Sequence, residues 1–294
     1  MARTMTDRRD TGRPGAVPGG TTNPRAGGIW DSALTSEEYA AVKGAGFEPV
    51  GQVLGTTVCG VGYEGLGGCP GAWKVVDGKR VPSSRWVPSL SQTARAIQAA
   101  RRLALSRAVA ECGALGGDGI VGVELCGDRF GEGFMEYTVR GTAVRARSRI
   151  RPHRPFTSHL RGQDFAKLLY SGWVPTGLAF GVALETRHDD WRTSRRTAWT
   201  ADTQEVDGYT QLLGHVRREA RKQLTLDAAR HGGDGMVVDD VELTVSESEC
   251  PTYGYTRDYI AEAVFVGTSI ARFGRSERSA GPTPLTIMRL ERER

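Results

Sequence analysis

The 294-residue chain lacks the features that would mark it as a membrane or exported protein. No stretch approaches the ~18 to 20 consecutive apolar residues that a membrane-spanning helix needs, and the start, which contains Arg and Pro, has no apolar segment like that of a signal peptide. We therefore expect a cytoplasmic protein with no membrane partner. The composition is 39% hydrophobic and 25% charged, which is typical of a folded chain with one large core or two smaller ones.

Cysteine and histidine are few and are not arranged as metal or disulfide motifs. The five cysteines are an odd number and include no CxxC pair: Cys59, Cys69, Cys112, Cys126 and Cys250. This excludes a disulfide framework and a zinc ribbon or finger. Cys59 and Cys69 flank a Gly-rich loop, either as a soft-metal pair or as two reduced thiols. The chain also lacks GxSxG, Walker and HExxH motifs, so we predict that it is not an enzyme.

Positive charge is in excess, but the excess lies at the two ends of the chain. Residues 1–28 carry five Arg and two Asp, and residues 274–294 carry five Arg and three Glu, which accounts for the net charge of +5. Phosphate recognition needs basic side chains gathered on one folded face, so we expect no specific nucleic-acid partner. Both ends are predicted to be tails, because the first has almost no aliphatic residues and the second begins as a loop.

An internal repeat divides the chain into two copies of one module. The pattern from Leu34 to Gly51 recurs with identical spacing from Leu160 to Gly177, shifted by 126 positions. Two shorter motifs recur in the same order. They are Gly-Gly-Asp-Gly at 116–119 and 232–235, and Gly-Thr-Ala-Val at 141–144, which returns as Gly-Thr-Ser-Ile at 267–270. We predict modules at 29–147 and 161–273, joined by a stiff Arg/Pro linker at 148–160.

Each module is predicted to contain the elements α-β-α-β-β. A short helix is followed by a strand, then by a long helix at about 91–115 or 207–231, in which apolar residues recur at helical spacing. Two strands complete each module, near 119–127 and 134–146, and near 235–246 and 258–271. The predicted class is α+β, with two tandem two-layer modules and small antiparallel sheets.

The first module resembles a known family. The run Cys112-Gly113-Ala114-Leu115-Gly116-Gly117-Asp118-Gly119-Ile120-Val121-Gly122-Val123-Glu124, followed by Gly141-Thr142-Ala143-Val144, is similar to the YbjQ-like small bacterial proteins described as heavy-metal-binding domains. The second module fits more loosely. The resemblance implies a dodecin-like fold whose members associate into rings, and hence a homo-oligomer that binds a divalent metal ion. The chain departs from the single-domain pattern by its duplication, its added helices and its long loops.

The acidic residues after each long helix are the candidate metal ligands. Asp118 and Glu124, like Asp234 and Asp240, are six residues apart. If each strand begins at the Asp, the alternation of a strand places both acids on one face, where they offer oxygens to a hard cation. The alternative is structural, with each Asp bonding the backbone of its own turn.

Three functional hypotheses follow. The first is a non-enzymatic, self-associating protein that binds a metal ion or small ligand through the acidic face. The second is a scaffold whose Arg-rich tails recruit an acidic partner. The third is a small-molecule pocket between the two copies, by analogy with flavin-binding dodecins.

Overall fold

The computed structural model describes residues 33–60, 73–76, 79–82, 90–131, 133–149, 151–188, 205–249 and 257–273. Both predicted tails, Cys69 and Cys250 lie outside these residues. The helices are α1 (Ser36–Gly44), α2 (Leu90–Ala114), α3 (Gly162–Tyr170) and α5 (Asp207–Ala229). The strands are β1 (Phe47–Gly60), β2 (Trp73–Val76), β3 (Lys79–Pro82), β4 (Gly119–Arg129), β5 (Phe134–Ala146), β6 (Phe156–Thr157), β7 (Trp173–His188), β8 (Gly235–Glu249) and β9 (Arg257–Arg272).

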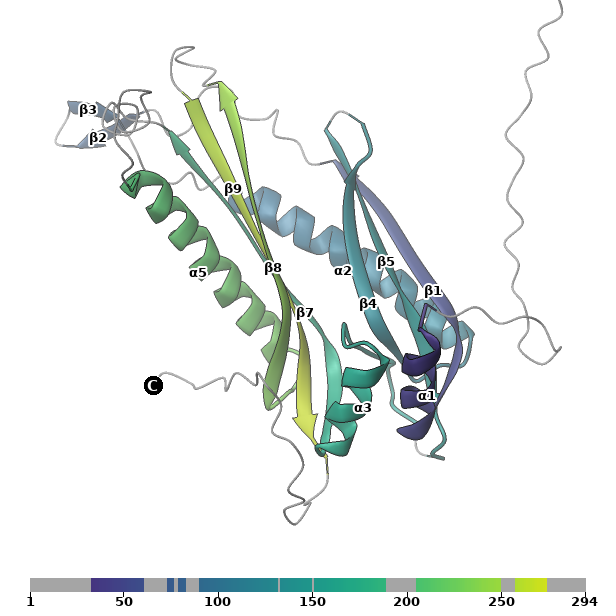
Figure 1. The fold of residues 1–294 in the computed structure, drawn as a ribbon. Helices are drawn as coiled ribbons and strands as arrows, with labels where there is room; N and C mark the ends of the chain where they lie inside the picture. Colours follow the sequence, from purple (N-terminus) through teal and green to yellow (C-terminus); the bar gives the residue numbers. More distant parts are fainter. Residues whose placement is uncertain are drawn as a thin grey trace, which may run out of the picture.

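The predicted α+β class and the element order of each half are confirmed (Figure 1). The first sheet has the strand order β1-β5-β4-β6, and the second sheet has the order β7-β9-β8. The pairing is antiparallel except between β4 and β6. The short hairpin β2–β3 lies in the long loop between β1 and α2. No helix in the described part of the chain is long and apolar enough to cross a membrane.

Local sequence explains where the helices begin and end. Thr35 and Glu38 form a capping box at the start of α1, in which each side chain bonds the backbone N–H of the other residue. After α2 the chain reverses at Gly116, whose φ of 70° favours glycine. The backbone N–H of Asp118 then donates to the carbonyl of Val144 at 2.7 Å, which starts the pairing of β4 with β5.

The two modules repeat one another in detail. A β-bulge between Pro49 and Gly51 in β1 has its counterpart between Pro175 and Gly177 in β7. A Cβ atom at Gly55 would lie 2.6 Å from the backbone N of Ala108, and one at Gly181 would lie 2.7 Å from that of Leu224. Each glycine therefore allows the long helix of its own module to lie directly on the first strand.

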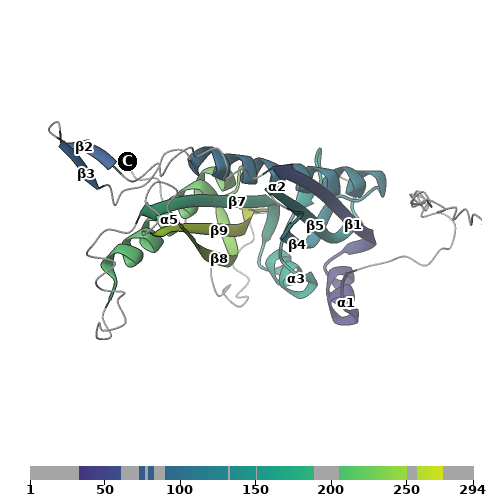
Figure 2. The ribbon, with the colours of Figure 1, turned by 90° about the horizontal axis from the view of Figure 1, so that it is seen from above.

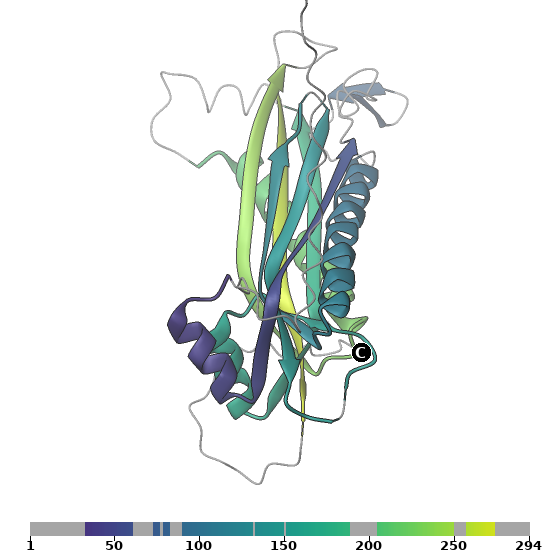
Figure 3. The same ribbon diagram turned by 90° about the vertical axis from the view of Figure 1, so that its right-hand side faces the viewer.

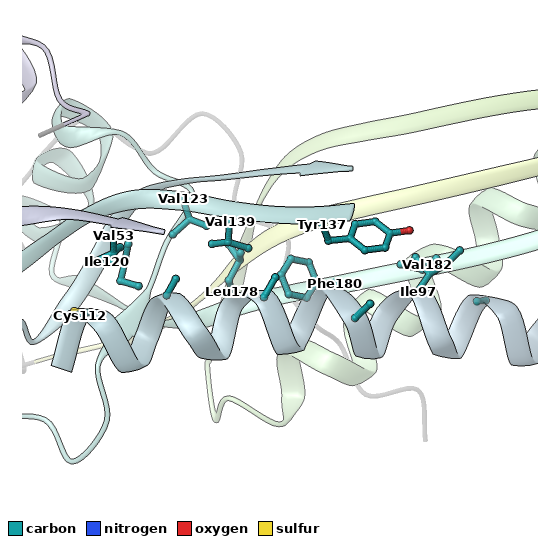
Figure 4. Close-up of a cluster of buried hydrophobic side chains, with 14 of the residues drawn as sticks. Val53, Ile97, Cys112, Ile120, Val123, Tyr137, Val139, Leu178, Phe180 and Val182 are labelled. Atoms are coloured by element: carbon teal, nitrogen blue, oxygen red, sulfur yellow. The ribbon is translucent and has the colours of Figure 1, made fainter. Parts of the chain in front are cut away.

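Helix α2 packs against both modules. Figures 2 and 3 show it lying along β1 of the first sheet while also reaching β7 of the second. The largest buried cluster accordingly draws on both sheets, with Val53, Tyr137 and Val139 from the first and Leu178, Phe180 and Val182 from the second (Figure 4). The two modules thus share one hydrophobic core, whereas α5 packs on the opposite face of the second sheet.

Part of the segment predicted as a linker is built into the core. Phe156 and Thr157 form β6, which pairs with β4, and Ser158 exchanges backbone hydrogen bonds with Ile120 and Val123 at 2.9 Å. Thr157, Ser158 and His159 are buried. The aromatic ring of Phe156 stacks on that of Phe165 in α3, so this segment fixes the second module against the first.

Candidate functional site

Asp118, the first predicted metal ligand, is a buried residue that stabilises the turn after α2. Its Oδ2 atom accepts a hydrogen bond from the backbone N–H of Ala146 at 2.8 Å and forms an ion pair with Arg151. Its own N–H and carbonyl groups bond Val144 and Phe156. The geometry matches the structural alternative, in which the aspartate satisfies the backbone around its turn.

Glu124 does not share a face with Asp118, contrary to the prediction from strand alternation. The register of β4 with β5 shifts between Val121 and Glu124, so the strand contains one extra residue there. Gly122, with a φ of 60°, lies in this bulge. Because a bulge reverses the alternation of side chains, a spacing of six residues no longer places two acids on one face. Glu124 pairs instead with Arg140 at 2.6 Å and with Arg161 at 3.0 Å.

The second module repeats this arrangement. The Oδ2 atom of Asp234 accepts a hydrogen bond from the backbone N–H of Arg272 at 3.0 Å, which is the counterpart of the bond between Ala146 and Asp118. A register shift between Val238 and Val241 again interrupts the alternation before Asp240. The side chain of Asp240 lies outside the described part.

The predicted acids do not fit a metal site. A cation at Asp118 or Glu124 would have to displace an arginine that already neutralises the carboxylate. Calcium usually takes six to eight oxygen ligands, and zinc takes four ligands. Across the described residues, no three His, Cys, Asp or Glu side chains lie close enough together to hold a metal ion.

The described cysteines are separate thiols. Cys112 is buried on α2, where its Sγ lies 3.4 Å from the carbonyl oxygen of Gly119. Burial, together with the nearby charge of Asp118, raises the pKa of this thiol to about 12. Cys59 is partly buried, and its pKa is also raised by burial. A raised pKa disfavours the thiolate form that binds soft metals.

Two pairs of histidine and acid lie along β7, one buried and one partly exposed. His188 contacts Asp258 at 2.7 Å, and both side chains are buried. His215 lies 3.3 Å from Glu185, whose pKa is raised chiefly by burial. Local sequence does not reveal these pairs, because their members are 70 and 30 positions apart in the chain. Each pair joins two elements of the second module, so their geometry indicates a stabilising role within that module.

The contact between the modules includes several polar side chains. Strand β7 forms an edge of the second sheet, and the backbone N–H of Phe180 on this edge donates to Oδ2 of Asp227 in α5 at 2.9 Å. The carbonyl of Phe180 accepts from Nε2 of Gln98 in α2 at 3.0 Å. Arg102 of α2 forms an ion pair with Asp227. Side chains from both long helices therefore bond the backbone of Phe180, whose own side chain is fully buried in the shared core.

Arg101 is a buried cation at the same contact. Its guanidinium lies 5.1 Å from the centre of the Tyr137 ring and 3.9 Å from Oε1 of Glu262 in β9. Its Nε and Nη1 atoms are buried without a hydrogen-bond partner. The pKa of Glu262 is raised, mainly by its burial. Arg101 thus links the first sheet, α2 and the second sheet.

The space where a pocket between the copies was predicted is filled by side chains. Figure 4 shows Leu178, Phe180 and Val182 meeting Tyr137 and Val139 above α2. Within the described residues, this part of the contact between the modules is a packed apolar core.

Comparison with known proteins agrees with this architecture. A family described as "Putative heavy-metal-binding" matches residues 88–147, which hold α2, β4 and β5 of the first module. Encapsulin nanocompartment protein Rv1762c of Mycobacterium tuberculosis (strain ATCC 25618 / H37Rv) is 31% identical over 258 residues, covering 84% of this chain and 87% of that protein. The chain belongs to the family of this encapsulin nanocompartment protein. The match extends well beyond the YbjQ-like segment, so the family relationship covers both modules.

Proposed function

We propose that this protein is a non-enzymatic assembly protein of the cytoplasm, which self-associates and forms part of an encapsulin nanocompartment. The similarity to an encapsulin nanocompartment protein over 84% of the chain is the observation that carries the proposal. The predicted acids Asp118 and Glu124 already bond a turn and pair with arginines, which argues against metal binding as the main role. The Arg-rich tails at 1–28 and 274–294 supply charge for recruiting an acidic partner.

Co-sedimentation with nanocompartments tests the proposal. The full chain would be produced together with an encapsulin shell protein, and the particles would be separated by size exclusion and ultracentrifugation. We expect the full chain in the particle fraction. A matched chain lacking residues 1–28 and 274–294 should keep its own oligomeric state but leave that fraction. Absence of the full chain from the particles would overturn the nanocompartment role.

Metal binding is the second candidate function, supported by the description of the family that matches residues 88–147. That the second module is also YbjQ-like is part of this proposal, because the family match covers only residues of the first module. Elemental analysis of the purified protein after incubation with zinc, copper or calcium decides between the two functions. We expect less than one metal ion per chain after desalting, because the described acids already have partners. Retention of one ion per module, lost in an Asp118→Asn, Asp234→Asn double variant, would restore the metal hypothesis.

A further inference from the structure

The same face of the first strand is buried in the second module and exposed in the first. Alternate residues of β7, namely Leu178, Phe180, Val182 and Leu184, form the face of the second sheet that α2 covers. Their counterparts at a shift of 126 are Gln52, Leu54, Thr56 and Val58 of β1, which we call the outer face of the first sheet. Phe180 is 0% exposed and Leu184 is 3% exposed, whereas Leu54 is 55% exposed and Val58 is 45% exposed. Apolar residues that are buried in the second module are thus exposed in the first.

At the edges of β1 and β7, an acidic side chain of the module's own long helix accepts an equivalent backbone hydrogen bond. The backbone N–H of Leu54 donates to Oε2 of Glu111 at 2.7 Å. The backbone N–H of Phe180 donates to Oδ2 of Asp227 at 2.9 Å. Leu54 corresponds to Phe180 at a shift of 126, and Glu111 corresponds to Asp227 at a shift of 116. The two edges differ in one respect: Asp227 also receives Arg102 from the long helix of the other module.

Helix α5 carries a counterpart of Arg102 at an exposed position. The shift of 116 that relates the long helices places Arg218 at the position of Arg102, and Arg218 is exposed on α5. Glu111 beside β1 is negative, although Arg107 and Arg140 also lie next to this strand. Glu111 therefore offers Arg218 an opposite charge at the position where Asp227 pairs with Arg102.

Apolar residues accompany this basic surface of α5. Val241 and Val245 lie on the face of the second sheet that packs against α5, and they are 42% and 47% exposed. Leu125 is the counterpart of Val241 at a shift of 116, and in the first module it packs into the core that the two modules share. Val241 thus occupies the position of a residue that packs against the shared core in the first module.

We propose that α5 and the adjoining face of the second sheet bind the outer face of the first sheet in another copy of this chain, with Arg218 paired to Glu111. The contact is head to tail and copies the internal contact between α2 and β7. It covers Leu54 and Val58, the exposed apolar residues that an edge strand otherwise presents to solvent. The two surfaces that meet are different, so the interface is heterologous. Each chain can bind one neighbour through α5 and another through its outer face, and the series of chains ends when it closes into a ring. This inference rests on the self-association in the proposed function.

Two single variants at exposed positions test the contact. Leu54→Arg places a cation opposite the arginines of α5, and Arg218→Glu reverses the charge that faces Glu111. Native mass spectrometry of the wild-type chain should give an oligomer, and each variant alone should give the 31.8 kDa monomer. The control is Tyr170→Arg on α3, which alters an exposed residue that lies neither on α5 nor on the two sheets and should leave the oligomer intact.

Mixing the two variants distinguishes a head-to-tail contact from a general loss of association or folding. The Leu54→Arg chain keeps its α5 surface, and the Arg218→Glu chain keeps its outer face. The mixture should therefore form a dimer with one chain of each kind and no larger species. A wild-type oligomer that both variants preserve would overturn the contact but leave self-association standing. A monomeric wild-type chain would overturn both.

Discussion

Arg102 of the first module forms an ion pair with Asp227 of the second, and this contact joins the two long helices beside the edge of β7. Asp227 is buried, so its charge requires the partners that Arg102 and the backbone N–H of Phe180 provide. The two sheets share a hydrophobic core at this place, so each module buries apolar residues of the other. The tandem arrangement is therefore integral to the stability of the chain.

Replacing Gly55 or Gly181 with alanine should destabilise the protein, because each glycine lies directly against a long helix. In Gly55→Ala or Gly181→Ala, the new Cβ would overlap the backbone of Ala108 or Leu224. We expect a loss of about 1–3 kcal/mol in the free energy of unfolding, measured by urea denaturation. Gly113→Ala is the control, because no neighbouring atom lies within 4 Å of its Cβ position. Equal stability of all three variants would contradict the close packing.

Asp118 should contribute to stability through its turn. Asp118→Ala leaves the N–H of Ala146 without its carboxylate acceptor, and we expect a loss of about 1–3 kcal/mol in the free energy of unfolding. Asp234→Ala should have a smaller effect because Asp234 is exposed. Thermal and urea denaturation measure both. If Asp118→Ala were as stable as the wild-type protein but lost a bound metal, the structural role would be wrong.

The thiols should differ in reactivity. Cys112 is buried with its pKa raised to about 12, whereas Cys126 is exposed. Iodoacetamide at pH 8 should therefore label Cys126 in the folded protein, and Cys112 should react only after denaturation. Peptide mass spectrometry measures the extent at each site, with the denatured chain as the control. Labelling of Cys112 at the rate of Cys126 in the folded protein would show that α2 is not packed as described.

His159 should make the protein less stable in mild acid. Its Nδ1 lies 2.8 Å from Oγ1 of Thr268, and burial lowers the pKa of the imidazole below 6.5, against a smaller opposing effect of Asp239 and Asp164. The unfolded chain takes up a proton as the pH falls through about 6.5, whereas the folded chain does not. Stability is therefore complete above that pH and is lost as the pH decreases below it.

Urea denaturation between pH 5 and pH 7.5 measures this dependence. His159→Gln should reduce the loss of stability below pH 6.5, and the exposed His153→Gln should leave it unchanged. An identical pH profile for the wild-type protein and His159→Gln would show that the buried imidazole does not cause the dependence.

Local sequence was sufficient to predict the main helices and strands and their order, but not β2, β3 or β6. The long helix predicted at about 91–115 is observed at Leu90–Ala114, because apolar spacing and the glycines after it depend only on neighbouring residues. The repeat predicted that both modules would have the same elements. The face on which Glu124 lies was not predicted correctly, because the bulge at Gly122 reverses the alternation of side chains. The lone glycine inside the strand was the local signal of this bulge.

The sequence by itself determined the two α-β-α-β-β modules, the turns between their elements and the absence of common catalytic motifs. Only the tertiary structure decided that α2 packs against both sheets, that Asp118 and Glu124 are paired with arginines, and that Phe180 is buried while its counterpart Leu54 is exposed. The reason is physical. Periodicity records which residues of one element lie together, whereas burial and ion pairing depend on side chains that the folded chain brings together from distant positions.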